Sequence, residues 1–147
     1  KGETQVENEK EKTFGFPKAQ VSFNITNIPG ECNLTTDGYH IINETLFLLE
    51  CKHSKNGIKA DDIEDALFKY HFFNQINEFS DGDATYNTKT VIVASSGGKT
   101  TKEILNELNE ISQECEKNSI IFIPIGKNDL KNGKEKILQK LNSIAKN

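Results

Sequence analysis

Two carboxylates and a lysine stand at the ends of two short apolar runs between Asp37 and Lys52. Asp37 precedes the first run, Glu50 and Lys52 close the second, and Asn43-Glu44 separates the runs as a polar turn. Successive side chains of a strand point to opposite faces, so Glu50 and Lys52 share one face and Cys51 points to the other. If the two runs pair as an antiparallel hairpin, Asp37 stands opposite Glu50.

This register predicts a divalent-metal site with a lysine beside it. Directly opposed residues of a hairpin have Cβ atoms about 4.5–5.5 Å apart. Two carboxylates at that separation repel each other unless a cation lies between them. The apolar residues before Cys51 are typical of a buried central strand, and the charges follow at its end.

The constellation Asp37-Gly38 and Glu50-Cys51-Lys52 on adjacent strands resembles the PD-(D/E)XK nuclease superfamily. The run 62–70 is similar to the helix that follows the E-x-K strand in type II restriction endonucleases, although the glycine common in that EDGLLK-like run is absent. The resemblance implies hydrolysis of DNA phosphodiester bonds with Mg²⁺, for which Mn²⁺ substitutes. It implies Asp37, Glu50 and the backbone carbonyl of Cys51 as metal ligands. Lys52 would orient or help deprotonate the attacking water and offset charge on the phosphorus.

Four further residues are accessory candidates because of their position relative to this motif. Glu31 precedes it and is a candidate metal ligand. His53 and Lys55 follow it directly and are candidates for contacts with phosphate or the attacking water. By the family's pattern, Lys69 would lie near the loop that holds Lys55. For each of the four, the alternative is an ordinary solvated side chain.

The remaining patterns predict an α/β fold, restriction-endonuclease-like, in which an antiparallel meander continues into parallel strands and helices flank the mixed central sheet. Residues 1–13 form a charged N-terminal segment and residues 14–147 a single domain. The expected strands are an extended segment over 14–27, the two strands of the hairpin, a strand over 88–94 and a strand over 119–125. The expected helices are one capped by Asp61 with Glu64 three residues on, one from Thr101 capped by Thr100 and Glu103, and one from about Lys134.

Two of these helices carry patterns with separate consequences. The helix from Thr101 is expected to bury one face, made of Ile104, Leu105, Leu108, Ile111 and Cys115. The segment from Lys127 to Lys146 holds six lysines against Asp129 and Glu135. These lysines form either a DNA-facing patch or a solvated face, and the sequence leaves both readings open.

Composition sets the remaining bounds. The net charge of −4 over 147 residues excludes a basic signature of the whole chain but permits a local basic rim. No apolar run is long enough for a membrane span. Three cysteines without C-x-x-C spacing indicate neither a disulfide framework nor a zinc site, which favours a reducing compartment such as the cytoplasm. Richness in Asn, Lys and Ile suggests a bacterial source, and the absence of methionine suggests a piece of a longer chain.

Three functions remain open. The similarity of the run 62–70 favours a restriction endonuclease over a Holliday-junction resolvase, and both usually act as homodimers. A non-catalytic α/β module that binds nucleic acid or a nucleotide is the alternative from another class. Nucleotide binding would use Ser95–Thr100, but Val93 stands where a Walker A motif needs its first glycine.

Overall fold

The structure is a computed structural model of the chain, and it describes residues 12–24, 31–56, 58–73, 78–81 and 84–146. Among these residues, a five-stranded mixed sheet forms the centre of the fold. Strand β3 (Gly38–Ile42) pairs antiparallel with β4 (Thr45–Ser54), which runs parallel to β6 (Ala84–Ser96). On the other edge of β6, β5 (Glu78–Asp81) pairs antiparallel and β7 (Ile121–Ile125) pairs parallel. The predicted α/β class is confirmed.

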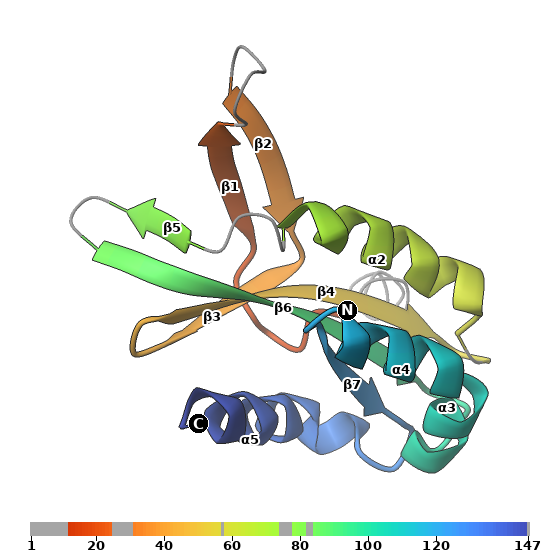
Figure 1. The fold of residues 1–147 in the computed structure, drawn as a ribbon. Coiled ribbons are helices and arrows are strands. Elements are labelled where there is room, and N and C mark those ends of the chain that lie inside the picture. The colour runs from red at the N-terminus through yellow and green to blue at the C-terminus, as the bar shows by residue number, and fades with distance from the viewer. Residues whose placement is uncertain (1–11, 25–30, 57, 74–77, 82–83, 147) are drawn as a thin grey trace, which may run out of the picture.

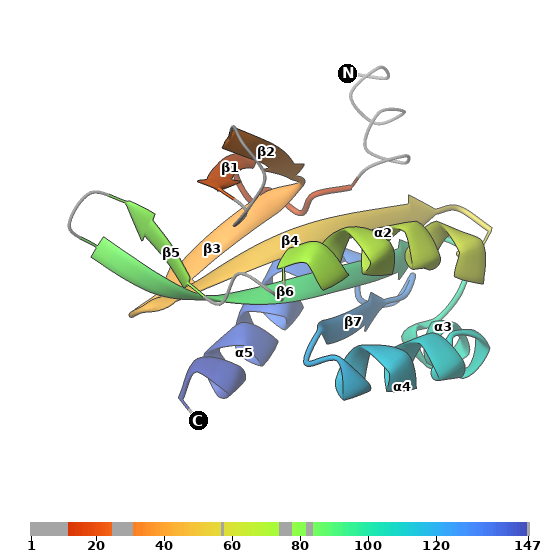
Figure 2. The same ribbon diagram turned by 45° about the horizontal axis from the view of Figure 1, so that its top comes forward.

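Helices cover both faces of this sheet (Figures 1 and 2). Helices α2 (Ala60–Phe73), α3 (Thr101–Glu107) and α4 (Asn109–Lys117) lie on one face, and α5 (Gly133–Ala145) lies on the other, after the short 3-10 helix η1 (Leu130–Asn132). Leu46 and Leu48 of β4 pack toward α2–α4, whereas Phe47, Leu49 and Cys51 pack toward α5. The near-continuous apolar run of β4 therefore reflects a strand buried on both faces.

A separate two-stranded ribbon precedes the central sheet. Strands β1 (Ala19–Asn24) and β2 (Glu31–Thr36) pair antiparallel with each other and project from the main body in Figure 1. The antiparallel part of the central sheet consequently consists of the β3–β4 hairpin and β5, and the earlier strands stand apart from it. The chain turns from one sheet to the other at Asp37, where the Thr36 hydroxyl donates to the Gly38 carbonyl at 3.1 Å.

Two predicted helix details are corrected. Helix α2 begins at Ala60, before the expected cap Asp61, and the carboxylate of Asp62 accepts a hydrogen bond from the Lys59 backbone N–H at 3.3 Å. This is the half of a capping box that an acid at the third helical position supplies. The single helix expected from Thr101 is two helices that meet at Leu108.

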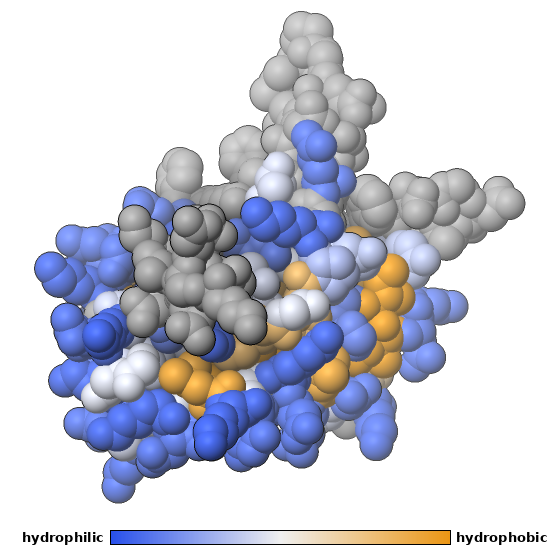
Figure 3. Space-filling view, turned by 180° about the vertical axis from the view of Figure 1, so that it is seen from behind, coloured by the Kyte–Doolittle hydropathy of each residue, from blue (hydrophilic) through white to orange (hydrophobic). Residues whose placement is uncertain are grey.

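The predicted buried face of this segment is confirmed in part. Ile104, Leu108 and Cys115 are buried and Ile111 is partly buried, but Leu105 is 41% exposed. The capping box of Thr100 and Glu103 is confirmed, with bonds of 3.1 and 2.9 Å. Seen from behind, the molecule shows hydrophobic residues in limited areas among hydrophilic ones (Figure 3). None of the helices among the described residues has the length and apolar character to cross a membrane.

Candidate functional site

The β3–β4 hairpin has the predicted register. Ile42 stands opposite Thr45, Tyr39 opposite Leu48, and Gly38 opposite Leu49. The paired residues end at Gly38 and Leu49, and Asp37 precedes Gly38 outside the strand, so the predicted pair of Asp37 and Glu50 stays a prediction. The tight connection uses Asn43 at φ 54°, a left-handed conformation that asparagine adopts more readily than most residues.

Asp37 contacts β4 directly, but the prediction that this strand ends at Glu50 and Lys52 is wrong, because β4 continues to Ser54 alongside β6. Its Oδ2 accepts a hydrogen bond from the backbone N–H of Cys51 at 2.9 Å. In a strand, the N–H and C=O of one residue point to the same edge. The carbonyl of Cys51 therefore faces the side on which Asp37 lies. Asp37 and this carbonyl thus lie on the same side of β4, and Cys51 is next to Glu50 in the sequence.

Glu50 and Lys52 lie on one face of β4, as predicted. Glu50 is only 7% exposed, and the Lys52 Nζ stands 3.9 Å from its Oε2. Burial raises the pKa of the Cys51 thiol well above its usual range, and the charges of Asp37 and then Glu50 raise it further. Both carboxylates thus raise the pKa of one thiol. The Lys52 ammonium lies near this buried acid, Glu50.

His53 and Lys55 have different surroundings. His53 stands opposite Ser95 across β4 and β6, and its Nδ1 lies 2.6 Å from the Ser95 hydroxyl oxygen. That hydroxyl also donates to the Lys52 carbonyl at 3.5 Å, so Ser95 ties the imidazole to the motif strand. Lys55 lies beyond the strand with an exposed side chain, and its carbonyl accepts a hydrogen bond from the Ser96 hydroxyl at 3.4 Å.

The other two accessory candidates are located by their backbone alone. Glu31 is the first residue of β2 and pairs with Asn24 in the separate ribbon. Lys69 lies within α2. The side chains of both residues fall outside the described part of the structure, so their proposed contacts remain predictions.

A pocket of about 340 Å³ opens beside Lys52. It is lined by Lys52, His53 and Ser54 from β4, and by Ile58, Asp62 and Asp65 before and within α2. Asp62 and Asp65 were missed as site residues because the acidic start of α2 was interpreted as a cap. Their spacing of three residues places them on one side of a helix that directly follows the E-x-K strand, and this was the available signal.

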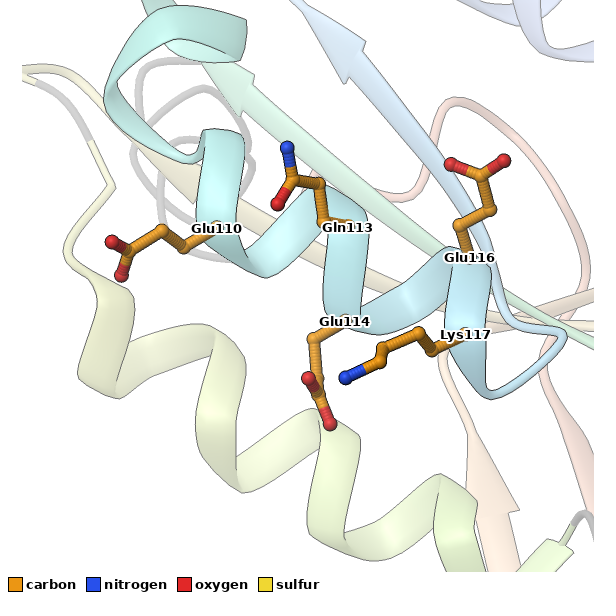
Figure 4. A pocket seen from close by; sticks show the side chains of 5 residues that line it. All are labelled: Glu110, Gln113, Glu114, Glu116 and Lys117. Carbon is orange, nitrogen blue, oxygen red and sulfur yellow. The ribbon is translucent and has the colours of Figure 1, made fainter.

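A larger hollow lies beside α4 but has different chemistry. Glu110, Gln113, Glu114, Glu116 and Lys117 line it (Figure 4). Glu114 extends toward α2, whereas Glu116 points to the opposite side of α4. Three glutamates and one lysine from a single helix make this surface unfavourable for phosphate. It contains none of the residues predicted for catalysis.

The loop Ser95–Thr100 does not present a phosphate cradle. Its backbone N–H groups already donate within the protein: Gly97 to the Ser54 carbonyl, Gly98 and Lys99 to the Ser96 hydroxyl, and Thr100 to the Glu103 carboxylate. A phosphate-binding loop needs such donors turned toward the ligand. This arrangement weighs against nucleotide binding at this loop.

The donor set at the hairpin suits a hard cation. Within the described ranges, no group of three or more His, Cys, Asp and Glu side chains could hold a metal ion. Side-chain ligation here would therefore come from Asp37 and Glu50 alone, with the Cys51 carbonyl as a third oxygen. Mg²⁺ is commonly bound by one or two carboxylates and keeps several waters, so this set fits Mg²⁺ better than zinc.

Comparison of the chain with protein-family models, with curated proteins and with solved structures finds no match.

Proposed function

We propose that the chain is a Mg²⁺-dependent endonuclease that hydrolyses DNA phosphodiester bonds. The observation that carries this proposal is the hydrogen bond from Cys51 N–H to Asp37. It joins the acid that precedes β3 to the part of β4 in which Glu50 and Lys52 share a face. In the proposed site, the two carboxylates and the Cys51 carbonyl would hold the ion, with Lys52 beside them.

Each residue has a role that follows from its position. Asp37, Glu50 and the Cys51 carbonyl would hold Mg²⁺ or Mn²⁺. When bound, the ion would supply Lewis-acid polarisation of the scissile phosphate and promote ionisation of an attacking water. Lys52 donates hydrogen bonds to that water and offsets the charge that develops on the phosphate. Its 3.9 Å separation from Glu50 is long for a direct hydrogen bond, so its donors can be redirected to a substrate.

Within this class we favour a type II restriction endonuclease, or the catalytic domain of one. The support is the resemblance of the run 62–70, which lies in α2, the first helix after β4, and buries Ile63, Ala66 and Leu67 against the face of the sheet that holds Leu46 and Leu48. Cleavage of both strands of a duplex requires two such sites, which implies a homodimer. The reduced, buried thiols of Cys51 and Cys115 suit work in the cytoplasm.

A plasmid cleavage assay tests the proposal. The wild-type protein with Mg²⁺ is expected to convert supercoiled plasmid to discrete linear bands, and Lys52→Gln is expected to lose this activity. Lys89→Gln is the matched control because Lys89 is an exposed lysine on the neighbouring strand β6. Selective cleavage of a four-way junction would instead indicate the resolvase. Cleavage by K52Q at the wild-type rate would contradict the role given to Lys52.

A further inference from the structure

The charge of the chain is divided unevenly. From Lys127 onward, six lysines face two acids, a net charge of +4, whereas the whole chain carries −4. All six lysines are exposed, and within the described residues their only ion pair is Lys136 with Asp129 at 3.8 Å. Much of this positive charge is therefore directed to solvent rather than used to neutralise the protein itself. One of these lysines, Lys134, lies next to the N-terminal residues that border the candidate site.

Residues 12–18 form a strap that connects α5 to Asp37. Gly133 at the start of α5 contacts the Phe14 ring so closely that a Cβ would stand 2.3 Å from it. Phe16 packs against Gly38, where a Cβ would stand 2.8 Å from that of Phe16. The strap also follows the edge of β3, because the Tyr39 N–H donates to the Pro17 carbonyl at 2.9 Å.

Three lysines lie on this strap or against it. The Lys12 ammonium lies 5.8 Å from the centre of the Phe14 ring, and the Lys134 ammonium lies 5.2 Å from that of Phe16. Such cation–π contacts hold an ammonium in place while leaving its donors available. Lys18 immediately precedes β1, whose first residue, Ala19, pairs with Thr36, the residue before Asp37. Lys18 is exposed.

We propose that Lys12, Lys18 and Lys134, here named the strap lysines, bind the phosphate backbone of a DNA duplex and lead it to Asp37 and Glu50. Three cations close to one segment favour the negatively charged phosphates of a duplex. Their aromatic anchors restrict two of the ammonium groups before the ligand arrives, which lowers the entropy lost on binding. The contacts are to phosphate, so they position the duplex without reading its sequence.

The test is DNA binding without metal, so that cleavage does not interfere. A labelled duplex is titrated in EDTA at several salt concentrations with wild-type protein and the K12Q/K18Q/K134Q variant. Loss of three phosphate contacts is expected to weaken binding at least about tenfold and to reduce the slope of log K against log salt by about 2.7. The control K102Q/K117Q/K140Q removes three exposed lysines from α3, α4 and α5. It is expected to keep most of the affinity and the slope.

A charge-preserving variant separates electrostatics from folding. K12R/K18R/K134R keeps all three cations and is expected to bind as the wild type does, even where the glutamine variant melts at a lower temperature. Equal losses in the strap and control variants, or no binding by the wild type, would overturn the inference. The inference rests on the proposed function only in taking DNA as the ligand. If strap-dependent binding is found but no cleavage occurs with Mg²⁺, the endonuclease proposal fails and the strap surface stands.

Discussion

Two substitutions of Asp37 should separate its structural role from its role in metal binding. Asp37→Ala removes the carboxylate oxygen that accepts a hydrogen bond from the Cys51 backbone N–H at 2.9 Å. Cys51 lies within the buried strand β4. An unsatisfied buried donor costs about 1–3 kcal/mol. For a chain of about 150 residues, each kcal/mol lowers Tm by about 2–4 °C. Asp37→Asn retains a carbonyl oxygen that can accept the same hydrogen bond, so its expected loss is below about 1 kcal/mol.

Metal binding, unlike stability, should be weakened in both variants. Both variants lose the negative charge that a hard cation requires, so both are expected to bind Mn²⁺ at least about tenfold more weakly, or about 1.4 kcal/mol. Urea unfolding measures the first effect and calorimetric titration with Mn²⁺ measures the second. Wild-type stability of D37A would refute the hydrogen bond to Cys51. Wild-type Mn²⁺ affinity of D37N would refute the assignment of Asp37 as a ligand.

Three further predictions concern the fold around the site. Leu141→Ala should lower the free energy of unfolding by about 2–5 kcal/mol in urea, because Leu141 is fully buried under the sheet; a loss below 1 kcal/mol would argue against that packing. Burial, and secondly the charge of Lys134, lower the pKa of His40. Its contribution to stability is therefore complete above pH 6.5 and declines as the pH falls, and K134Q should raise this pKa in an NMR titration; an unchanged value would place Lys134 elsewhere. Hydrogen bonds from the Thr100 backbone N–H and then from its hydroxyl lower the pKa of Glu103; T100A removes only the hydroxyl, so it should raise this pKa in part and make the melting temperature less sensitive to acidification below the usual glutamate range; wild-type acid sensitivity would contradict this.

The site hairpin could be predicted because local patterns determine it. A two-residue turn at Asn43-Glu44 and apolar residues on both sides allow one register only, since a shift by one residue would move every side chain to the other face. The structure has this register from Ile42–Thr45 to Gly38–Leu49, and the predicted pair of Asp37 and Glu50 lies one position beyond the paired residues. The capping box at Thr100 was predictable for the same reason, because all its atoms lie within one helical turn.

The remaining features depend on contacts between distant segments. Asp61 was predicted as the cap, but the sequence pattern alone does not distinguish it from Asp62. In the structure the Lys59 backbone N–H donates to the carboxylate of Asp62. Leu105 was placed in the core because the break at Leu108 has no glycine or proline to announce it. The separation of the β1–β2 ribbon from the central sheet also leaves no trace in the alternation of apolar residues. Residues that pack from far along the chain, such as Phe16 on Gly38, bring Lys134 toward the site.

The sheet divides the interior into two compartments that do not mix. Even-numbered residues of β4 belong to the compartment under α2–α4, and odd-numbered residues belong to the one under α5. Glu50 and Lys52 project from the first compartment, while Asp37 is fastened to the backbone of Cys51, whose thiol is embedded in the second. The proposed reaction centre thus lies between the two halves of the interior. A change in the packing of either half would displace the oxygen atoms of the candidate metal ligands, whereas elsewhere in the fold it can be tolerated.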